Sequence, residues 1–500
     1  MNDLLNSLAY MVEPMPMLYC IIGVVAGVVV GAIPGLGGGM LMALVLPATF
    51  AMDNLLAQVL LIGIYVGGVT GGLSSAVLIG VPGTPAAVMT AIDGNAMARK
   101  GFAARALSIG IMASLFGGIV SWLVLAGLSA PLARLASQLQ SFDYFVFIAL
   151  GLILIAFAGQ GSVLKSLISG VLGISLALVG FDSISATNRF TFGVPTLSNG
   201  FDLLAVLIGA FAVRQMLVDS SDERPVVQQT SARLSEIFHE LGRPFRHLGN
   251  LIRSSLIGTI IGLMPGIGAN IGAIVAYSAA KGLSKNREEF GHGSEEALVA
   301  SESGNNATVG GALVPMIALG IPGSGQDVLL MAALILHQIQ PGPLLVSEHP
   351  EVFYGIISTY LVANIVTLFV MVLSVRYLRS VLSVPKYLLV PLVLMMCTVG
   401  VISTNNRVED TAIMFAFGVL GLFMSWFRFP LAPFVIGFIL APLAEERLRT
   451  AAGTARGNWL ELLMTPVPLA AIAILIVIGL TSLIGRKHFR TEMGTQPKKT

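Results

Sequence analysis

The chain has 500 residues, of which 55% are hydrophobic and 11% are charged, with a formal net charge of +2. A soluble domain has about 25% charged residues, so this composition and a mean hydropathy of +0.87 exclude an ordinary soluble protein. The net charge gives no sign of nucleic-acid binding. Cys20 and Cys397 are too few and too far apart for a disulfide framework or a metal cluster.

The first twenty residues contain Asp3 and Glu13 but neither Lys nor Arg. A signal peptide begins with basic residues, so we expect the first apolar run to remain in the mature protein. Runs such as 17–33 and 465–485 match the roughly 20 residues that cross a bilayer, and about a dozen such runs occur along the chain. The sequence therefore predicts an all-α polytopic membrane protein, with multiple passes through the bilayer.

The first apolar run ends in the stretch GAIPGLGGGM. Proline lacks a backbone donor, and clustered glycines weaken a helix. Unpaired backbone groups cost several kcal/mol each in hydrocarbon, so a helix break at membrane depth is tolerated only beside protein or a watery cavity. This stretch therefore predicts a broken or re-entrant helix.

One long polar interruption lies at 219–253. Apolar residues recur at helical spacing from Leu234 to Ile252, and arginines flank this stripe. The pattern favours an amphipathic helix at the membrane surface, bent or broken near Gly242 and Pro244. A plain linker helix is the alternative. The segment divides the chain into a first transmembrane repeat at 1–218, a second repeat with additional carboxy-terminal spans at 254–485, and a tail at 486–500.

The two halves of the chain repeat one another. Residues 231 positions apart are Gly23 and Ser254, Gly27 and Gly258, Gly31 and Gly262, Pro34 and Pro265, Gly35 and Gly266, and Gly37 and Gly268. A second element, GVPGTP at 80–85, recurs 240 positions later as GIPGSG at 320–325. Two different Pro-Gly elements, each present twice in the same order, indicate an internal duplication.

The charge of equivalent loops indicates that these repeats are inverted. After the first break, only the second half has basic residues, namely Lys281, Lys285 and Arg287. After the second break, only the first half has them, namely Arg99, Lys100 and Arg105. Since Lys and Arg accumulate in cytoplasmic loops, equivalent loops face opposite sides, as in many secondary transporters. We expect a periplasmic N-terminus, a cytoplasmic central segment and a cytoplasmic C-terminus.

The broken helices suggest a ligand site built from backbone. A half-helix that begins after a break directs free N–H groups toward an anion, and one that ends there directs carbonyls toward Na⁺. The candidate substrate-binding residues are Pro34, Gly35, Gly37, Gly38, Gly39, Pro82, Gly83, Thr84, Pro265, Gly266, Gly268, Asn270, Pro322, Gly323, Ser324 and Gly325. Helix packing explains Gly23 and Gly27, and single proline kinks are common in membrane helices. Four breaks in two matched pairs favour a ligand site.

Side chains near the breaks suggest a cation site that lies mainly in the second half. Acids inside a membrane are functional by default, and the candidate cation-binding residues are Asp327, Glu302, Asn305 and Asn306, where Na⁺ is the metal expected. In SESGNNATVGG, helical spacing puts Ser301, Asn305 and Thr308 on one face and Glu302 and Asn306 on the next. A cavity wall and a polar helix start at the interface both fit that stretch. Asp93, near Arg99 and Lys100, is either a functional acid or a solvated loop acid.

Other chemistries have little support in the sequence. The Gly-rich stretches lack the Gly-Lys-Ser/Thr ending of a phosphate-binding loop and do not complete GxGxxG. His239, His247 and His337 show no metal-ligand spacing. We therefore expect neither an enzyme nor direct use of ATP, and no organic cofactor.

Four motifs together resemble one known family. GAIPGLGGGM, GVPGTPAAVMTAIDGNAMARKG, GLMPGIGANIGAIVAYSAAK and SESGNNATVGGALVPMIALGIPGSG are similar to the large membrane (permease) subunit of tripartite tricarboxylate transporters, from about residue 20 to residue 440. One departure is that Gln326 and Asp327, rather than small residues, follow the second Pro-Gly element.

The resemblance implies a bacterial inner-membrane symporter for a di- or tricarboxylate or a related organic acid, driven by Na⁺ or H⁺. It implies two partners, a periplasmic solute-binding protein and a small four-span membrane subunit. It also implies an elevator-type mechanism, in which a moving core contains the broken segments and a fixed scaffold contains the central helix. The alternative is a cation-independent uniporter or a channel-like pathway for organic anions.

Overall fold

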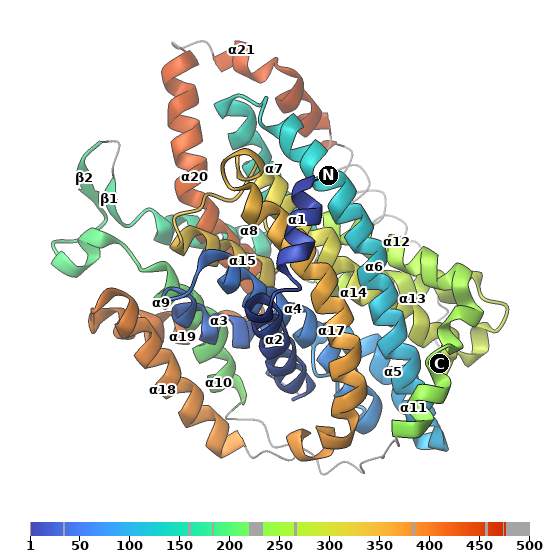
Figure 1. The fold of residues 1–500 in the computed structure, drawn as a ribbon. Helices are drawn as coiled ribbons and strands as arrows, with labels where there is room; N and C mark the ends of the chain where they lie inside the picture. The colour runs from blue at the N-terminus through green and yellow to red at the C-terminus, as the bar shows by residue number, and fades with distance from the viewer. Residues whose placement is uncertain are drawn as a thin grey trace, which may run out of the picture.

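The computed structural model describes residues 2–33, 36–158, 162–182, 185–219, 234–264, 268–382, 386–455, 459–473 and 475–476. These residues form an α-helical bundle with one short β-hairpin, which projects from the helical body (Figure 1). The helices are α1 (Asn2–Tyr10), α2 (Pro14–Ala32), α3 (Gly38–Thr49), α4 (Asn54–Ile79), α5 (Val88–Met97), α6 (Ala103–Ala136), α7 (Ser141–Ala158), α8 (Val163–Ala177), α9 (Leu203–Ile208), α10 (Arg214–Asp219), α11 (Leu234–Glu240), α12 (Leu248–Leu263), α13 (Gly268–Leu283), α14 (Glu295–Leu319), α15 (Gly325–Leu336), α16 (Leu345–Glu348), α17 (Pro350–Leu382), α18 (Lys386–Asn405), α19 (Glu409–Trp426), α20 (Leu431–Ala455) and α21 (Trp459–Leu463). The strands are β1 (Gly180–Asp182) and β2 (Thr187–Arg189). Short 3-10 or π segments include η1 (Pro85–Ala87), η4 (Gly209–Val213) and η5 (Arg243–His247).

Long apolar helices confirm a polytopic membrane protein. Within the described residues, 5 helical stretches are long and apolar enough to cross a membrane, and one of them, α2, contains the predicted run 17–33 except for its last residue. The other stretches are Asn54–Ile79, Val88–Ala136, Pro350–Val375 and Glu409–Trp426. Further apolar helices, α3, α13 and α15 among them, are too short to cross alone. About half of the predicted run at 465–485, including all of 477–485, lies outside the described residues.

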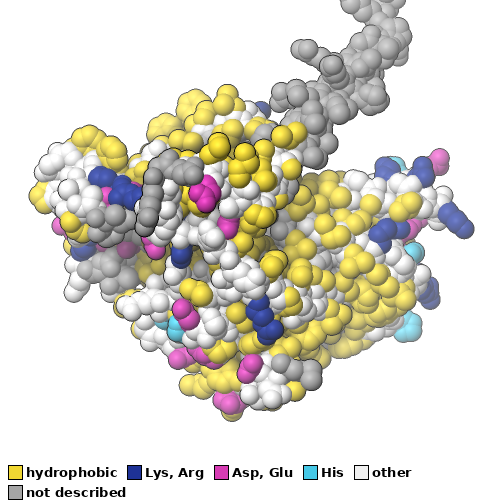
Figure 2. Space-filling view, turned by 90° about the horizontal axis from the view of Figure 1, so that it is seen from above, with side chains coloured by type: hydrophobic (Ala, Val, Ile, Leu, Met, Phe, Trp, Pro, Cys, Tyr) yellow, Lys and Arg dark blue, Asp and Glu magenta, His cyan; other side chains and the backbone are white. Residues whose placement is uncertain are grey.

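Charged side chains are sparse over much of the surface. Figure 2 shows a broad expanse of hydrophobic side chains, while Lys and Arg gather toward the ends of the molecule in that view. Such a surface suits contact with lipid rather than with water.

The helices α2 and α3 form a hairpin. Gly23, Gly27 and Gly31 of α2 touch α4 successively at Leu60, Ile64 and Gly68. Because the residue numbers increase along both helices from one contact to the next, α2 and α4 run parallel. Gly38 at the start of α3 again lies against Gly68, and the chain must then return to the start of α4. The pair α12 and α13 is built alike, since Gly258 and Gly262 touch α14 at Gly304 and Thr308, and Gly272 of α13 returns past Thr308.

The chain also turns back after α4 and after α14. Each helix ends at a glycine in the left-handed region, Gly80 with φ 72° and Gly320 with φ 71°, a conformation that costs other residues energy. Beyond Gly80 the chain dips back, so that Gly83 lies beside Gly72 of α4. Beyond Gly320 it dips back likewise, and Gly323 lies beside Ala312 of α14.

The described part of the central segment, 234–253, is helical, and it is broken between Glu240 and Arg243, near the predicted Gly242 and Pro244. The helix α11 ends at Glu240, and the 3-10 turn η5 starts at Arg243. The next helix, α12, begins at Leu248, so the expected boundary between 253 and 254 falls inside a helix. Ile237 is buried against the bundle, while Phe238 and Phe245 are exposed. This alternation fits an amphipathic helix.

Ion pairs attach the central segment to two long helices. Glu240 pairs with Arg105 of α6 at 3.2 Å and with Arg243 at 3.0 Å. Glu295 of α14 pairs with the same two arginines, at 3.6 Å and 2.9 Å. The four side chains form a closed ring with alternating charge. Burial would raise the pKa of Glu240, but hydrogen bonds and charges from Arg243 and Arg105 outweigh this and hold its pKa below the ordinary value of 4.5.

We predict that this ring weakens in acid. A depressed pKa means that the unfolded carboxyl group binds its proton more readily, so the stabilisation is present above pH 4.5 and is lost as the pH falls through the folded-state pKa. Glu240→Gln should therefore lower the thermal stability of the purified protein at about pH 6, and the difference from wild type should shrink by about pH 4. Glu236→Gln, at an exposed position of the same helix, is the control and should have no effect. A difference between Glu240→Gln and wild type that persists unchanged in acid would contradict the prediction.

Candidate functional site

The first interruption lies at 33–37, and two of its predicted residues, Pro34 and Gly35, lie outside the described residues. The helix α2 closes at Ile33, with φ −81° and ψ 114°. Gly37 precedes α3 in an extended conformation, with φ −69° and ψ 159°. A β-carbon added at Gly37 would meet no atom within 4 Å. This position therefore faces open space at the tip of the hairpin.

The third interruption repeats the geometry of the first, and its Pro265 and Gly266 also lie outside the described residues. The helix α12 closes at Met264, with φ −85° and ψ 114°, close to the angles of Ile33. The helix α13 then begins at Gly268, with Asn270 in its first turn. The side chain of Asn270 is not among those described.

The second interruption packs closely against the first. A β-carbon at Gly83 would touch the carbonyl oxygen of Gly31 and would come within 2.6 Å of the Ser75 hydroxyl oxygen. Thr84, which follows, places its side chain against Gly72 of α4. Pro82 lies in the extended stretch between Gly80 and Gly83. Glycine at 83 therefore permits contact between chain segments, and space for a ligand is not what requires it.

The fourth interruption packs against the third in the same way. A β-carbon at Gly323 would lie 2.8 Å from the Ala312 β-carbon and 3.3 Å from the carbonyl oxygen of Gly262. Pro322 and Gly323 are buried. Ser324 caps α15, whose first residue is Gly325, by accepting a hydrogen bond from the backbone N–H of Asp327 at 3.3 Å.

Contacts between the halves complete a ring of the four interruptions. Gly39 of α3 faces Gln326 of α15, whose side chain would lie 3.5 Å from a β-carbon at Gly39. The helix α13 contacts η1, which follows Thr84. Each interruption thus adjoins two others, directly or through the helix that follows it. The structure gathers the predicted substrate-binding positions that it describes into one region of the bundle.

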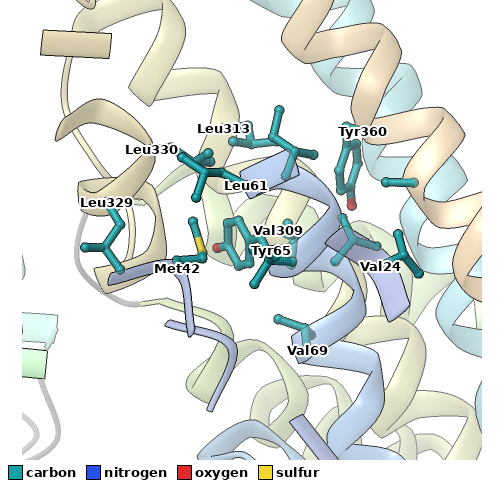
Figure 3. Packing of buried hydrophobic residues seen from close by; sticks show 14 of the residues in the cluster. Val24, Met42, Leu61, Tyr65, Val69, Val309, Leu313, Leu329, Leu330 and Tyr360 are labelled. Carbon is teal, nitrogen blue, oxygen red and sulfur yellow. The ribbon is translucent and has the colours of Figure 1, made fainter. Parts of the chain in front are cut away.

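A hydroxyl pair links the first half of the chain to the fourth interruption. The Tyr65 hydroxyl of α4 lies 2.9 Å from the Ser324 hydroxyl. Figure 3 shows Tyr65 among Met42, Leu61 and Val309 of the main hydrophobic core. Beside this pair, Asp327 is 0% exposed, and neither of its carboxylate oxygens has a hydrogen-bond partner in the described part of the chain.

Glu302 of α14 lies in a separate and fully bonded network. Its carboxylate accepts hydrogen bonds from the hydroxyls of Thr90 and Ser114, the latter at 2.9 Å. Asn306 donates to Ser114 at 2.8 Å and accepts from Thr70 at 2.8 Å. The network connects α4, α5, α6 and α14 inside the protein.

The polar stretch of α14 is helical and buried, which a polar helix start at the interface would not be. Ser301, Glu302, Asn305, Asn306 and Thr308 are all at most 1% exposed. Asn305 differs from its neighbours, because neither atom of its amide has a partner among the described residues. Thr84 also has a buried hydroxyl without a partner in those residues.

Sequence reasoning missed the hydroxyl partners of these residues. Tyr65, Thr70, Thr90 and Ser114 are single polar residues in apolar runs, and hydroxyls in membrane helices commonly bond their own backbone. No signal in one sequence distinguishes them. The internal repeat offered one clue to Tyr65. It lies 240 positions before Asn305, the offset that relates the two copies of the second Pro-Gly element, and so occupies the position equivalent to a predicted site residue.

Asp93 is not a solvated loop acid, and that interpretation was wrong. It is 0% exposed, and its carboxylate accepts the backbone N–H groups of Gly291, Gly293 and Ser294, each at 2.9 Å, and the Tyr277 hydroxyl at 2.9 Å. These partners belong to α13 and to the loop that follows it. Asp93 thus fastens this loop to α5.

The interrupted helices and the buried polar groups between them define a polytopic α-helical membrane protein. The sequence model of the Tripartite tricarboxylate transporter TctA family matches residues 17–436, and the chain belongs to this family. It is therefore the large subunit of a tripartite tricarboxylate transporter, and the family is one of transporters rather than enzymes. This confirms the resemblance inferred from the four motifs.

Two relatives come from Agrobacterium vitis. One, described as an uncharacterized 52.8 kDa protein in the TAR-I ttuC' 3' region, is 34% identical over 500 residues, which cover 98% of both chains. The other, described as an uncharacterized protein in the TAR-II ttuC' 3' region, is 31% identical over 227 residues, which are 45% of this chain and 94% of that protein. No solved structure matches.

Proposed function

We propose that this subunit imports a di- or tricarboxylate, or a related organic acid, by cation symport across the bacterial inner membrane. A periplasmic solute-binding protein would deliver the substrate, and a small four-span subunit would complete the complex. Membership of the tripartite family supports this arrangement. The N-terminus would be periplasmic and the C-terminus cytoplasmic, as the loop charges suggest.

The observation that carries the proposal is the ring formed by the four interruptions. Helices α3, α13 and α15 all begin in this region, and the first N–H groups of a helix have no partner within it. With the partial positive charge of each helix start, they suit carboxylate groups. Gly37 to Gly39, Gly83 to Thr84, Gly268 to Asn270 and Gly323 to Gly325 would contribute, together with Pro34, Gly35, Pro265 and Gly266.

Paired contacts support two inverted repeats. Gly31 touches Gly83 in the first half, and Gly262 lies beside Gly323 in the second. These residues are related by the two sequence offsets of 231 and 240. In an inverted pair, each half would form one side of the substrate site.

An elevator mechanism fits this arrangement. Re-entrant hairpins that meet at one site form a compact body, which could carry substrate past a fixed scaffold. The repeats at 1–218 and 254–485 would each contribute to both parts, and 219–253 and 486–500 would remain at the cytoplasmic surface. The coupling cation, Na⁺ or H⁺, would bind among Asp327, Glu302, Asn305 and Asn306.

Reconstitution tests the proposed function directly. The complete three-protein system in liposomes should accumulate radiolabelled citrate, succinate or malate, only with its binding protein and only under an inward Na⁺ or proton gradient. A cation-independent uniporter or channel would give flux without accumulation. Uptake that ignores both gradients would reject symport.

A further inference from the structure

The two halves of the chain are joined by a hydrogen bond at one place, whereas the side chains at the equivalent sequence positions have no hydrogen-bond partner among the described residues. Tyr65 of α4 reaches Ser324 at the fourth interruption. The offset of 240 positions that relates the second interruption to the fourth also relates Tyr65 to Asn305, and Thr84 to Ser324. Asn305 and Thr84 are therefore the two residues at the equivalent sequence positions. Consistent with this, α14 contacts η1, the turn that follows Thr84.

The end of the site at Asn305 and Thr84 is uncharged and has unused hydrogen-bonding groups. Asn305 is 1% exposed, and its amide oxygen and nitrogen both lack partners among the described residues. The Thr84 hydroxyl lacks one as well. A buried polar group without a partner costs about 1–3 kcal/mol, so these two side chains are available to a group that the described residues do not supply. An amide N–H and a hydroxyl can both donate to a carboxylate.

The other end of the site, at Tyr65 and Ser324, contains a buried acid that forms no ion pair with another described residue. Asp327 is fully buried, with both carboxylate oxygens unpartnered in the described part of the chain. It takes part in none of the ion pairs found among those residues. A buried ionised carboxylate is stable only when a cation pairs with it. The hydroxyl oxygens of Tyr65 and Ser324 lie beside it and suit a hard monovalent cation.

We propose that the two ends of the site bind different ligands. Asn305 and Thr84 bind a carboxylate of the substrate, whereas Asp327, Ser324 and Tyr65 bind the coupling cation, a sodium ion or a proton. This rests on the proposed carboxylate symport and refines it, because it moves Asn305 from the cation to the substrate and Ser324 from the substrate to the cation. It also supplies a coupling mechanism: the unneutralised Asp327 repels an anion, and the cation removes that repulsion.

The first test separates accumulation from exchange in Asp327→Asn. The complete system is reconstituted with radiolabelled citrate, succinate and malate. Gradient-driven accumulation should fall at least about tenfold, whereas exchange of internal for external acid should keep a measurable rate, because the carboxylate end is intact. Inward Na⁺ and proton gradients, applied separately to wild type, identify the cation. Tyr65→Phe is the second variant, and it should raise the cation concentration or gradient needed for half-maximal uptake.

The second test places a negative charge at the carboxylate end and, as a control, at an exposed position away from the site. Asn305→Asp should raise the half-saturating concentration of acid for exchange about tenfold or more, because like charges repel. Gln138→Glu, at an exposed position just beyond α6, should leave that concentration within about twofold. Thermal unfolding of each purified variant checks its folding, and Asn305→Leu replaces Asn305→Asp if the acid prevents insertion.

The outcomes separate this inference from the proposed function. If Asp327→Asn abolishes exchange while Asn305→Asp leaves it intact, the assignment of the two ends is overturned. Equal effects of Asn305→Asp and Gln138→Glu would overturn it as well. If wild type moves none of the three acids under either gradient, the proposed function fails.

Discussion

Gly323→Val is expected to abolish transport and to destabilise the protein, whereas Gly37→Val is expected to abolish transport alone. At Gly323 the new β-carbon would lie 2.8 Å from that of Ala312, so α14 or the interruption must move. Such overpacking costs about 1–3 kcal/mol. At Gly37 no atom lies within 4 Å, and its φ of −69° suits valine. The added bulk there would occupy only the space in which we place the substrate.

Thermal unfolding and liposome uptake, measured on the same preparations, test this pair. Gly323→Val should lower the midpoint of unfolding by several degrees, as expected of a loss of about 1–3 kcal/mol, and Gly37→Val should not. Gly127→Val, at an exposed position of α6 with no atom within 4 Å, is the control and should keep both properties. Normal uptake by Gly37→Val would remove the first interruption from the substrate site.

Asp93→Asn is expected to release the loop between α13 and α14. The carboxylate accepts three backbone N–H groups and the Tyr277 hydroxyl. An amide keeps one acceptor oxygen and turns its NH₂ group toward other donors. Hydrogen bonds to charged groups contribute about 1.5–3 kcal/mol each, so a loss of about 3 kcal/mol is expected. Amide hydrogen exchange in the loop should then accelerate about 100-fold.

Tyr277→Phe calibrates this result, because it removes one of the four donors. It should accelerate exchange in the same loop only about tenfold, as expected for a single bond to a charged group of about 1.5 kcal/mol. Exchange should stay unchanged in α20, which lies elsewhere in the bundle (Figure 1). If Asp93→Asn and wild type exchange alike, the carboxylate does not hold the loop.

The helix interruptions could be predicted because proline and glycine act locally. Residues 33–37 and 264–267 separate helices where the sequence contains Pro-Gly, and α4 and α14 each end at the glycine that opens the second element. The helix that contains Glu302 could be predicted from the spacing of its polar residues. These features depend on the backbone chemistry of neighbouring residues, which a single sequence contains.

The contacts between distant segments could not be predicted in the same way. The basic residues after Asp93 left a solvated loop acid open as one of two interpretations, yet its partners are about 200 positions away, as Gly293 shows. The hydroxyls that bond Glu302 come from α5 and α6, and no local pattern marks them. The need for glycine at Gly83 and Gly323 was predicted, but we had attributed it to ligand access, and the structure shows packing instead.

The ring of Arg105, Glu240, Arg243 and Glu295 has a mechanical consequence. It joins the amphipathic segment to α14, the helix that contains Glu302 and Asn305. If α14 travels with the substrate, as the proposed elevator requires, the amphipathic segment must travel with it or the ring must open first. Opening the ring would separate two arginines from two glutamates, so the ion pairs would add to the energetic barrier of each transport cycle.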